Sequence, residues 1–313
     1  GKATWGDASP LIQVDGVERS MNDIDPNEIE SISILKDASA TAVFGVRGAN
    51  GVILITTKRG REGKAHISFS TSASIQMPTK MVETANSYEY AMFYNQMRAN
   101  DPPAGEKPVK TFSDGVIQKF RDGSDPIRFP SINWIDYIMG DATLQRQHNL
   151  NISGGTDKVR YFISAGAYTQ GGLFNEFSLP YGISYQYRRF NYRSNLDIDV
   201  TKTTTISFNV AGNVNSSEKP RTSQGSSGMV KNIYYSTPFR SAGFVNDKLV
   251  YTTTDSQSDG LNLPFVGDAD PFTYYGGGAA HSINNSLNAD LILNQKLDFI
   301  TVSYTHLTLP TIA

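Results

Sequence analysis

The sequence predicts an α+β domain followed by an incomplete antiparallel transmembrane β-barrel, of which about seven strands are present. Residues 10–60 mix short strands with capped helical turns, whereas the chain from His66 onward alternates apolar and polar residues with period two. The connections between the alternating segments are short and long in turn. No apolar run, Val52–Ile55 included, approaches the roughly 18 residues that a membrane helix needs.

Composition argues against several classes of function. The 313 residues include 39% apolar and 19% charged residues and carry a net charge of −2, so no strong basic field is present to gather nucleic acid. The chain has no cysteine, which excludes disulfides, thiolate metal sites and cysteine nucleophiles. Its histidines show no HxxH or HExxH spacing, and no Gly-x-Ser-x-Gly elbow occurs. We therefore expect no metal, no cofactor and no enzymatic activity.

The first region is expected to form a compact α/β unit. Leu11–Val14 is a short strand that ends at a turn pair, Asp15 and Gly16. Asp25 and the proline after it supply an N-cap and a first helical position, and residues 29–35 then return to a strand. This first half therefore predicts two strands on either side of one helical turn.

A helix and a central strand complete this unit. We expect Asp37 to cap a helix of small residues over 38–44, with Gly45 as its left-handed stop. Val52–Thr57 is apolar enough to be a buried central strand. The region therefore reads as a small sheet with two short helices.

Period-two alternation defines the strands of the second region. In 66–76, Ile67, Phe69 and Ile75 face one way, while the polar residues between them face the other. A sheet with one apolar and one polar face follows from this pattern. The further strands that show it, some weakly, are expected over 148–154, 159–169, 192–200, 206–214 and 287–294. A seventh strand is expected near 299, after the turn at 294–296.

The length of each connection indicates the side of the membrane on which that connection lies. Tight turns at one end of a barrel and long loops at the other are typical of outer-membrane barrels, with the turns in the periplasm. A soluble sandwich would rarely carry two structureless loops of about 70 residues. The stretch 221–228 is expected to be flexible enough to gate or to meet a lid. We expect periplasmic turns at Asp157, Thr203 and Gln295 and external loops around Gly105, Gly182 and Gly228.

Three ungapped blocks resemble a known family. Pro10–Val17, Ile29–Ala40 and Gly45–Lys58 are similar to the plug of SusC/RagA-type TonB-dependent receptors. Asn86–Ala91 also resembles the first external excursion of that family. Phe44–Val46 departs mildly from the Tyr-Gly-Ser-like sequence that is more usual there.

The resemblance implies a plugged barrel of about 22 strands in the Gram-negative outer membrane. It further implies coupling to TonB, a SusD-like surface lipoprotein, and oligosaccharide or oligopeptide cargo. We expect 1–62 to be an N-terminally truncated plug, with the TonB box upstream, and 63–301 to be the first barrel strands and external loops. Residues 302–311 match one translated frame of a transposon-type sequencing adapter, and 302–313 are expected to be an artefact, the alternative being a real strand that contains Pro310.

Candidate site residues follow from the plug motif and from the aromatic loops. The glycine spacing fits neither GxGxxG nor a Walker loop, and Glu28 and Glu30 are interpreted as solvated charges. Arg47 has three open interpretations: a lock to a barrel-wall carboxylate, a solvated side chain, or a cargo contact. The aromatic loop residues either stack on cargo or serve as membrane girdle and loop packing. The plug-motif residues, with a structural role, are Asp15, Gly16, Lys36, Asp37, Gly45, Arg47, Gly48, Asn50 and Gly51, and the candidate cargo aromatics are Tyr234, Tyr235, Tyr274 and Tyr275.

Active import of a large nutrient by plug displacement is the function that this reading predicts. A passive porin is the first alternative, but residues 10–60 would obstruct its lumen. A secreted carbohydrate-binding or hydrolytic β-sandwich is the second alternative, and it predicts a protein of the soluble fraction.

Overall fold

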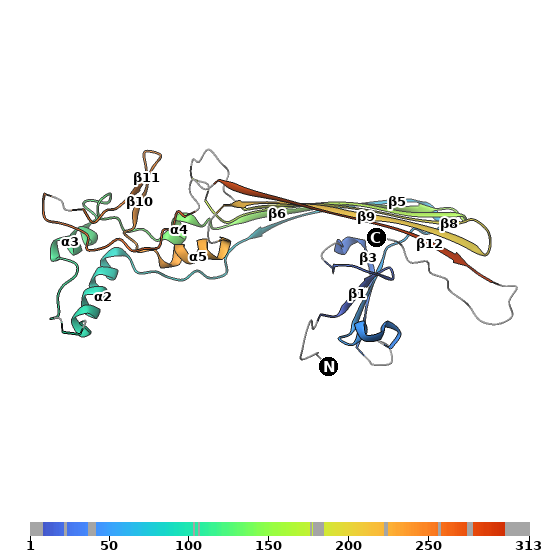
Figure 1. Ribbon diagram of the computed structural model, residues 1–313. Helices are drawn as coiled ribbons and strands as arrows, with labels where there is room; N and C mark the ends of the chain where they lie inside the picture. Colours follow the sequence, from blue (N-terminus) through green and yellow to red (C-terminus); the bar gives the residue numbers. More distant parts are fainter. Residues whose placement is uncertain are drawn as a thin grey trace.

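The chain forms a small plug, a long sheet and a layer of loops and helices beyond one end of the sheet (Figure 1). This computed structural model describes residues 9–21, 24–36, 42–102, 104–105, 107–175, 177, 185–221, 225–255, 258–273 and 278–297. No helix among these residues is long and apolar enough to cross a membrane.

The plug is built on a four-stranded sheet in the order β2-β1-β4-β3. Strand β4 is central, as its apolar sequence predicts, with β1 parallel on one side and β3 antiparallel on the other. Val14, Ile24 and Ile55 form its core. The strands are β1 (Leu11–Val14), β2 (Val17–Glu18), β3 (Ile29–Leu35) and β4 (Val52–Thr57), and the 3-10 helices are η2 (Pro26–Glu28) and η3 (Ala42–Gly48).

Local turn chemistry explains these boundaries. Asp15 and Gly16 both have positive φ, 51° and 87°, which is the geometry of a type I′ hairpin turn between β1 and β2. The Asp25 carboxylate accepts from the backbone N–H of Asn27 at 2.8 Å and caps η2. Gly45 has positive φ as expected, but it kinks η3 rather than ending it. The predicted cap Asp37 lies outside the described residues.

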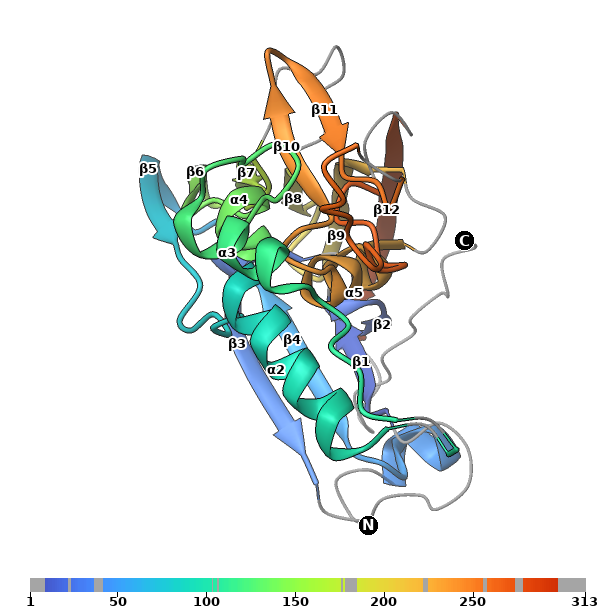
Figure 2. The same cartoon turned by 90° about the vertical axis from the view of Figure 1, so that its left-hand side faces the viewer.

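Six long antiparallel strands form the second sheet, in the order β12-β9-β8-β7-β6-β5 (Figure 2). Strands β5 and β12 are the edges of this sheet, which is not closed. The fold class is therefore confirmed as a plug followed by an incomplete barrel wall, and the seventh strand expected near residue 299 lies outside the described residues. The strands are β5 (Gly63–Gln76), β6 (Thr143–Gly155), β7 (Val159–Gly171), β8 (Gln186–Asp199), β9 (Thr204–Pro220) and β12 (Ala279–Gln295).

The two faces of this sheet have opposite chemistry. The plug lies against one face, and no described element covers the other (Figure 1). The face toward the plug, here called the polar face, buries Asn149, Asn191, Arg193 and Asn209. The opposite face, here called the outward face, leaves large apolar side chains exposed. Among them are Ile67, Phe69, Leu150, Ile163, Phe190, Phe208, Val214, Leu287 and Leu291.

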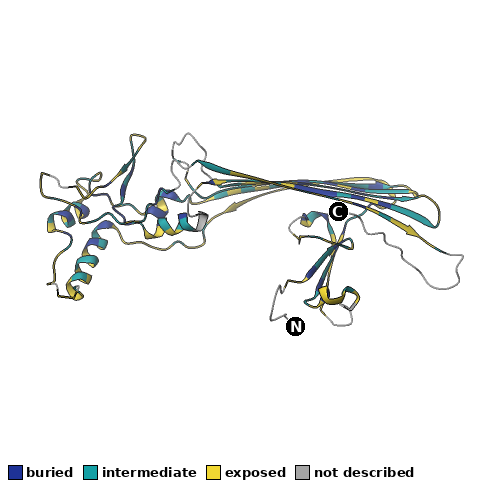
Figure 3. Cartoon of the chain, in the orientation of Figure 1, coloured by how far each residue is buried: buried dark blue, intermediate teal, exposed yellow. Residues whose placement is uncertain are grey.

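Three long connections fold together at one end of the sheet. Residues 77–142, 172–185 and 221–278, here called the loop layer, share two apolar cores. In one core Trp134 of the first connection packs with Met229 and Phe272 of the third, and in the other Phe112 packs with Phe239. Figure 3 shows buried segments, in dark blue, on the helices of this layer. The elements of the layer are α2 (Ser87–Asn100), α3 (Asp114–Asp122), α4 (Trp134–Ile138), α5 (Gly225–Tyr235), β10 (Ser241–Val245) and β11 (Lys248–Tyr251).

The loop layer corrects one expectation and refines another. Gly228, expected in a flexible stretch, lies inside helix α5. The long connections are folded rather than structureless, because each supplies apolar residues to a core that no single connection could complete. Asn86 begins α2 with a capping box to Glu89, which gives the segment 86–91 a helical start.

Candidate functional site: the plug and wall interface

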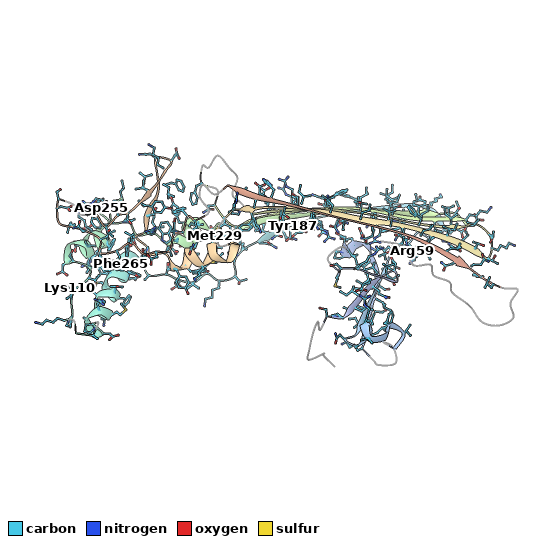
Figure 4. The ribbon with its side chains drawn as sticks, viewed as in Figure 1. Arg59, Lys110, Tyr187, Met229, Asp255 and Phe265 are labelled. Atoms are coloured by element: carbon cyan, nitrogen blue, oxygen red, sulfur yellow. The ribbon has the colours of Figure 1, made fainter. Side chains whose placement is uncertain are left out.

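The interface between the plug and the sheet is formed by polar side chains on both sides. The plug contributes the β1–β2 turn, η2 and the end of β4, and the sheet contributes the polar face of β8, β9 and β12. Figure 4 labels Arg59 where the plug reaches the sheet, close to the point where the chain passes from β4 into β5.

Glu28 is the most deeply buried acid of this interface. Its carboxylate accepts from the Arg193 Nε at 2.8 Å and from the Asn191 Nδ2 at 2.9 Å. The side chains of Glu28 and Arg193 are each only 2% exposed. The expectation that Glu28 is solvated is therefore wrong, because strand β8 covers it, whereas Glu30 is exposed and pairs with Arg61 at 3.0 Å.

Asp15 joins the turn of the plug to the same arginine. Its carboxylate accepts from the Thr57 backbone N–H at 2.9 Å and from the Thr57 hydroxyl at 2.7 Å. The Arg193 Nη1 lies 3.9 Å from an oxygen of Asp15. A type I′ turn places this carboxylate beside the end of β4, so the Asp-Gly pair serves both the hairpin and the interface.

The end of β4 is held by amide and guanidinium groups. The Asn195 side-chain amide donates to the Thr57 hydroxyl at 3.0 Å and to the Lys58 carbonyl at 2.8 Å. Arg59 donates to Asp197 at 2.9 Å and to Asn209 at 3.2 Å. This arrangement fixes the last plug residues against the wall that begins four residues later at β5.

A fourth contact lies toward the free edge of the sheet. Arg19, which follows the β1–β2 hairpin, pairs with Asp290 of β12, and both side chains are 7% exposed. Arg19 and Arg59 of the plug thus form ion pairs with acidic residues of the wall. In the opposite sense, Arg193 of the wall pairs with acidic residues of the plug.

The energetics of this interface favour a contact that is ordered yet separable. A buried ion pair gains Coulomb energy but loses the hydration of both ions, so its net contribution is often close to zero. Removing only one partner costs about 3–5 kcal/mol, because the other charge stays buried and unpaired. Such an interface fixes one docked geometry without the large burial of apolar area that would hold the plug permanently.

The predicted plug-motif residues are spread over the plug rather than gathered at the wall. Arg47 pairs with Glu18 of the plug, with 69% of its side chain exposed. None of the described wall residues pairs with Arg47, and the ion pairs between the plug and the described wall are made by Arg19, Arg59 and Glu28. Lys36 is exposed, Gly48 is buried and Asn50 is half-buried, while Asp37 lies outside the described residues.

At one position of the motif there is a clear steric reason for glycine. Gly51 has φ of 97°, and a Cβ atom there would lie 3.2 Å from the Leu35 carbonyl oxygen. A larger residue would strain the turn that leads into β4 and would crowd the end of β3.

Comparison with known proteins is consistent with this geometry. Residues 4–52 match the TonB-dependent receptor plug domain. TonB-dependent receptor P3 of Formosa agariphila is 30% identical over 270 residues, which is 85% of this chain and 23% of the relative. TonB-dependent receptor SusC of Bacteroides thetaiotaomicron is 29% identical over 198 residues, which is 60% of this chain and 17% of the relative. The RagAB peptide importer in its closed-closed state aligns with a TM-score of 0.55 and 25% identity, over 69% of this chain and 25% of that chain.

The chain belongs to the SusC/RagA-type TonB-dependent receptors. It spans about a sixth to a quarter of the length of the relatives and the structure named above. The matches are to receptors and importers, and no cluster of three or more His, Asp or Glu side chains able to hold a metal ion occurs in the part of the receptor chain that is described.

The receptor chain also has a small cavity in its loop layer. This cavity of about 300 Å³ is lined by Tyr90, Trp134, Tyr234 and Tyr235, together with smaller residues. Burial, and to a lesser extent the neighbouring Tyr94, raises the pKa of Tyr90, so its phenol stays neutral. Tyr235 is 71% exposed and Tyr234 is 38% exposed, whereas Phe272 is part of a buried core. The two other candidate aromatics, Tyr274 and Tyr275, lie outside the described residues.

The wall residues of the site were missed by sequence reasoning, although a signal was present. Arg193, Asn195 and Asp197 alternate with apolar residues on one strand, and they were interpreted only as the polar face. Charged side chains in the middle of a long strand need partners, and the acids of the plug are the nearest source in a plugged barrel.

Proposed function

We propose that the parent protein imports a large nutrient across the outer membrane by displacing its plug. In this proposal residues 1–62 are the plug, and residues 63–301 are the first strands and loops of the wall. The observation that carries the proposal is the position of the plug on the polar face of the sheet, bound through the buried pair of Glu28 and Arg193. The apolar outward face then meets lipid, which is the reverse of a soluble sandwich.

Energy for displacement would come from TonB, and a SusD-like lipoprotein would cover the loop layer. Folded loops with two apolar cores support a docking role, since they present a fixed surface rather than a mobile one. The cargo would be an oligopeptide or oligosaccharide. The aromatic cavity beside Tyr234 and Tyr235 is the place in this chain where rings of either cargo could stack.

Conductance of the full-length parent in planar bilayers distinguishes this function from a passive porin. We expect low conductance with the plug present and large conductance after deletion of residues 1–62. Uptake by cells should require TonB. High conductance with the intact plug, or uptake that continues without TonB, would show a porin instead.

The side of the membrane can be tested with epitope tags in the parent. A tag at Gly260, an exposed turn residue with φ of 70° in the third connection, should be labelled on intact cells. A tag at Asp157, in the tight turn between β6 and β7, should be labelled only after the outer membrane is permeabilised. The reverse pattern would overturn the proposed topology.

A further inference from the structure

Formally charged side chains are confined to one end of the outward face. Because side chains alternate between the two faces of each strand, the exposed apolar residues show which positions face outward. Of the Asp, Glu, Lys and Arg residues on the six described strands, only Arg146, Arg188 and Glu218 occupy such positions. All three lie near the end at which β5 finishes and β6 and β8 begin. The loop layer starts from the same end (Figure 1).

The two arginines share one row across the sheet. Arg146 of β6 is in register with Thr169 of β7, and Thr169 is in register with Arg188 of β8. Since neighbouring strands are about 4.8 Å apart, the two backbones are separated by about 10 Å, with only the small Thr169 side chain between them. Long guanidinium side chains can converge over that distance.

Neither arginine has a carboxylate partner among the described residues. Arg188 donates to Gln186 of its own strand at 3.0 Å, and Arg146 makes no hydrogen bond or ion pair with another described residue. Glu218 lies one row nearer the end of the sheet, opposite Gln186, and its carboxylate is 3.6 Å from a ring nitrogen of His281. Both guanidinium groups are therefore on exposed residues with donors to spare.

Their depth matches the edge of a lipid bilayer. Along β8 the outward residues from Ile198 to Phe190 carry no charge, and Arg188 follows next. Ten residues at about 3.3 Å each span about 33 Å, which a strand tilt of about 40° reduces to about 25 Å, the usual height of the apolar band of a barrel. The arginine row thus falls where the acyl chains end and the headgroups begin.

We propose that Arg146 and Arg188 bind the phosphate of a lipid headgroup in the outer leaflet of the outer membrane. The inference rests on the proposed outer-membrane topology. A guanidinium group presents a planar fork of donors that matches phosphate oxygens, and two forks on one row can hold a single phosphate from two sides. The pair anchors a phosphorylated glycolipid against the apolar band formed by Phe190, Leu150 and their neighbours.

The test uses the full-length parent in nanodiscs of phosphatidylcholine, with monophosphorylated lipid A as the added probe. Retention of the probe is measured by native mass spectrometry. The double variant Arg146→Gln/Arg188→Gln should bind it about tenfold more weakly, since partly screened charge-assisted hydrogen bonds are lost. Arg121→Gln, an exposed arginine of the loop layer, is the matched control and should bind as the parent does.

Two further measurements distinguish an effect of charge from an effect on folding. Arg146→Lys/Arg188→Lys should retain clearly more probe than the glutamine pair, and dephosphorylated lipid A should bind all variants equally weakly. The proposal would be overturned by unchanged binding in the glutamine pair or by an equal loss in the lysine pair. It would also be overturned if the parent bound dephosphorylated lipid A as tightly as the monophosphorylated lipid. Uptake is not the readout, so this site and the import function can fail independently.

Discussion

The plug meets the wall through ion pairs and amide hydrogen bonds, whereas the loop layer packs through clusters of aromatic rings. At the wall, Glu28 and Arg193 are buried together, and Asn195 holds the end of β4. In the loop layer, Phe112 and Phe239 are fully buried with ring centroids 5.6 Å apart. Aromatic burial is non-directional and hard to reverse, while a buried polar contact can be exchanged for water at little net cost.

The difference matches the two tasks that the proposed function assigns. The plug has to leave the wall during import, so its contacts are of the kind that water can replace. The loop layer has to keep one shape while a partner docks and cargo passes, so it contains cores of its own.

Arg193→Ala in the full-length parent should have the largest effect. Glu28 and Asp15 would then keep buried carboxylates without their cation, and the docking of the plug should weaken by about 4 kcal/mol. Protease sensitivity of the plug and leakage of large antibiotics should both rise. Arg47→Ala removes an exposed pair and is the control, with an effect of about 0–1 kcal/mol. Equal behaviour of the two variants would show that the buried pair does not hold the plug.

Phe239→Ala should loosen the loop layer and leave the plug unchanged. The cavity left among Tyr90, Phe112 and Phe120 should cost about 3 kcal/mol of local stability. Hydrogen exchange of the amides of α3 reports this change, and Tyr235→Ala, which removes an exposed ring, serves as the control. Faster exchange in the plug as well would contradict the independence of the two regions.

The smallest effect concerns an ion pair at the rim of the loop layer. Arg128 donates to both oxygens of Asp259, at 2.8 and 3.1 Å, and holds the pKa of that carboxyl at about 2. A lowered pKa means that the contact is fully present above the ordinary value of about 4 and is lost as the pH falls toward 2. Exchange of the Leu261 amide, which donates to Asp259, should stay constant from pH 7 to 5 and, after correction for intrinsic exchange rates, lose protection below 4. Asp259→Asn should abolish that step; a step of equal size in the variant would assign it to another group.

Sequence signals predicted the plug better than the interface because the signals of the plug are local. The Asp15 and Gly16 turn, the Asp25 cap and the apolar run of β4 each depend on neighbouring residues, and their bounds were predicted correctly. Asn191 and Glu28 are 163 positions apart, so their contact depends on how the plug sits in the wall. Alternation alone identified Arg193 as polar but could not name its partner.

The loop layer was the least predictable part for a related reason. Phe112 and Phe239 lie in different connections, so the core that they share depends on a contact between segments that are distant in the sequence. The expectation of flexible loops followed from composition, and it failed at Gly228 because α5 is stabilised by Trp134 and Phe272 from other parts of the layer.

Cross-linking the plug to the wall tests whether the plug has to leave the wall during import. The 313 residues of this chain contain no cysteine, so in a parent whose other cysteines have been replaced by serine, Thr57→Cys and Asn195→Cys can be introduced where the two side chains are in hydrogen-bond contact. A short reducible thiol cross-linker would then join β4 of the plug to β8 of the wall in the full-length parent. Displacement of the plug predicts that uptake stops when the cross-link forms and returns when it is reduced. Treatment of either single-cysteine variant with the cross-linker should leave its uptake unchanged. Uptake at the full rate through a fully cross-linked receptor would contradict the account.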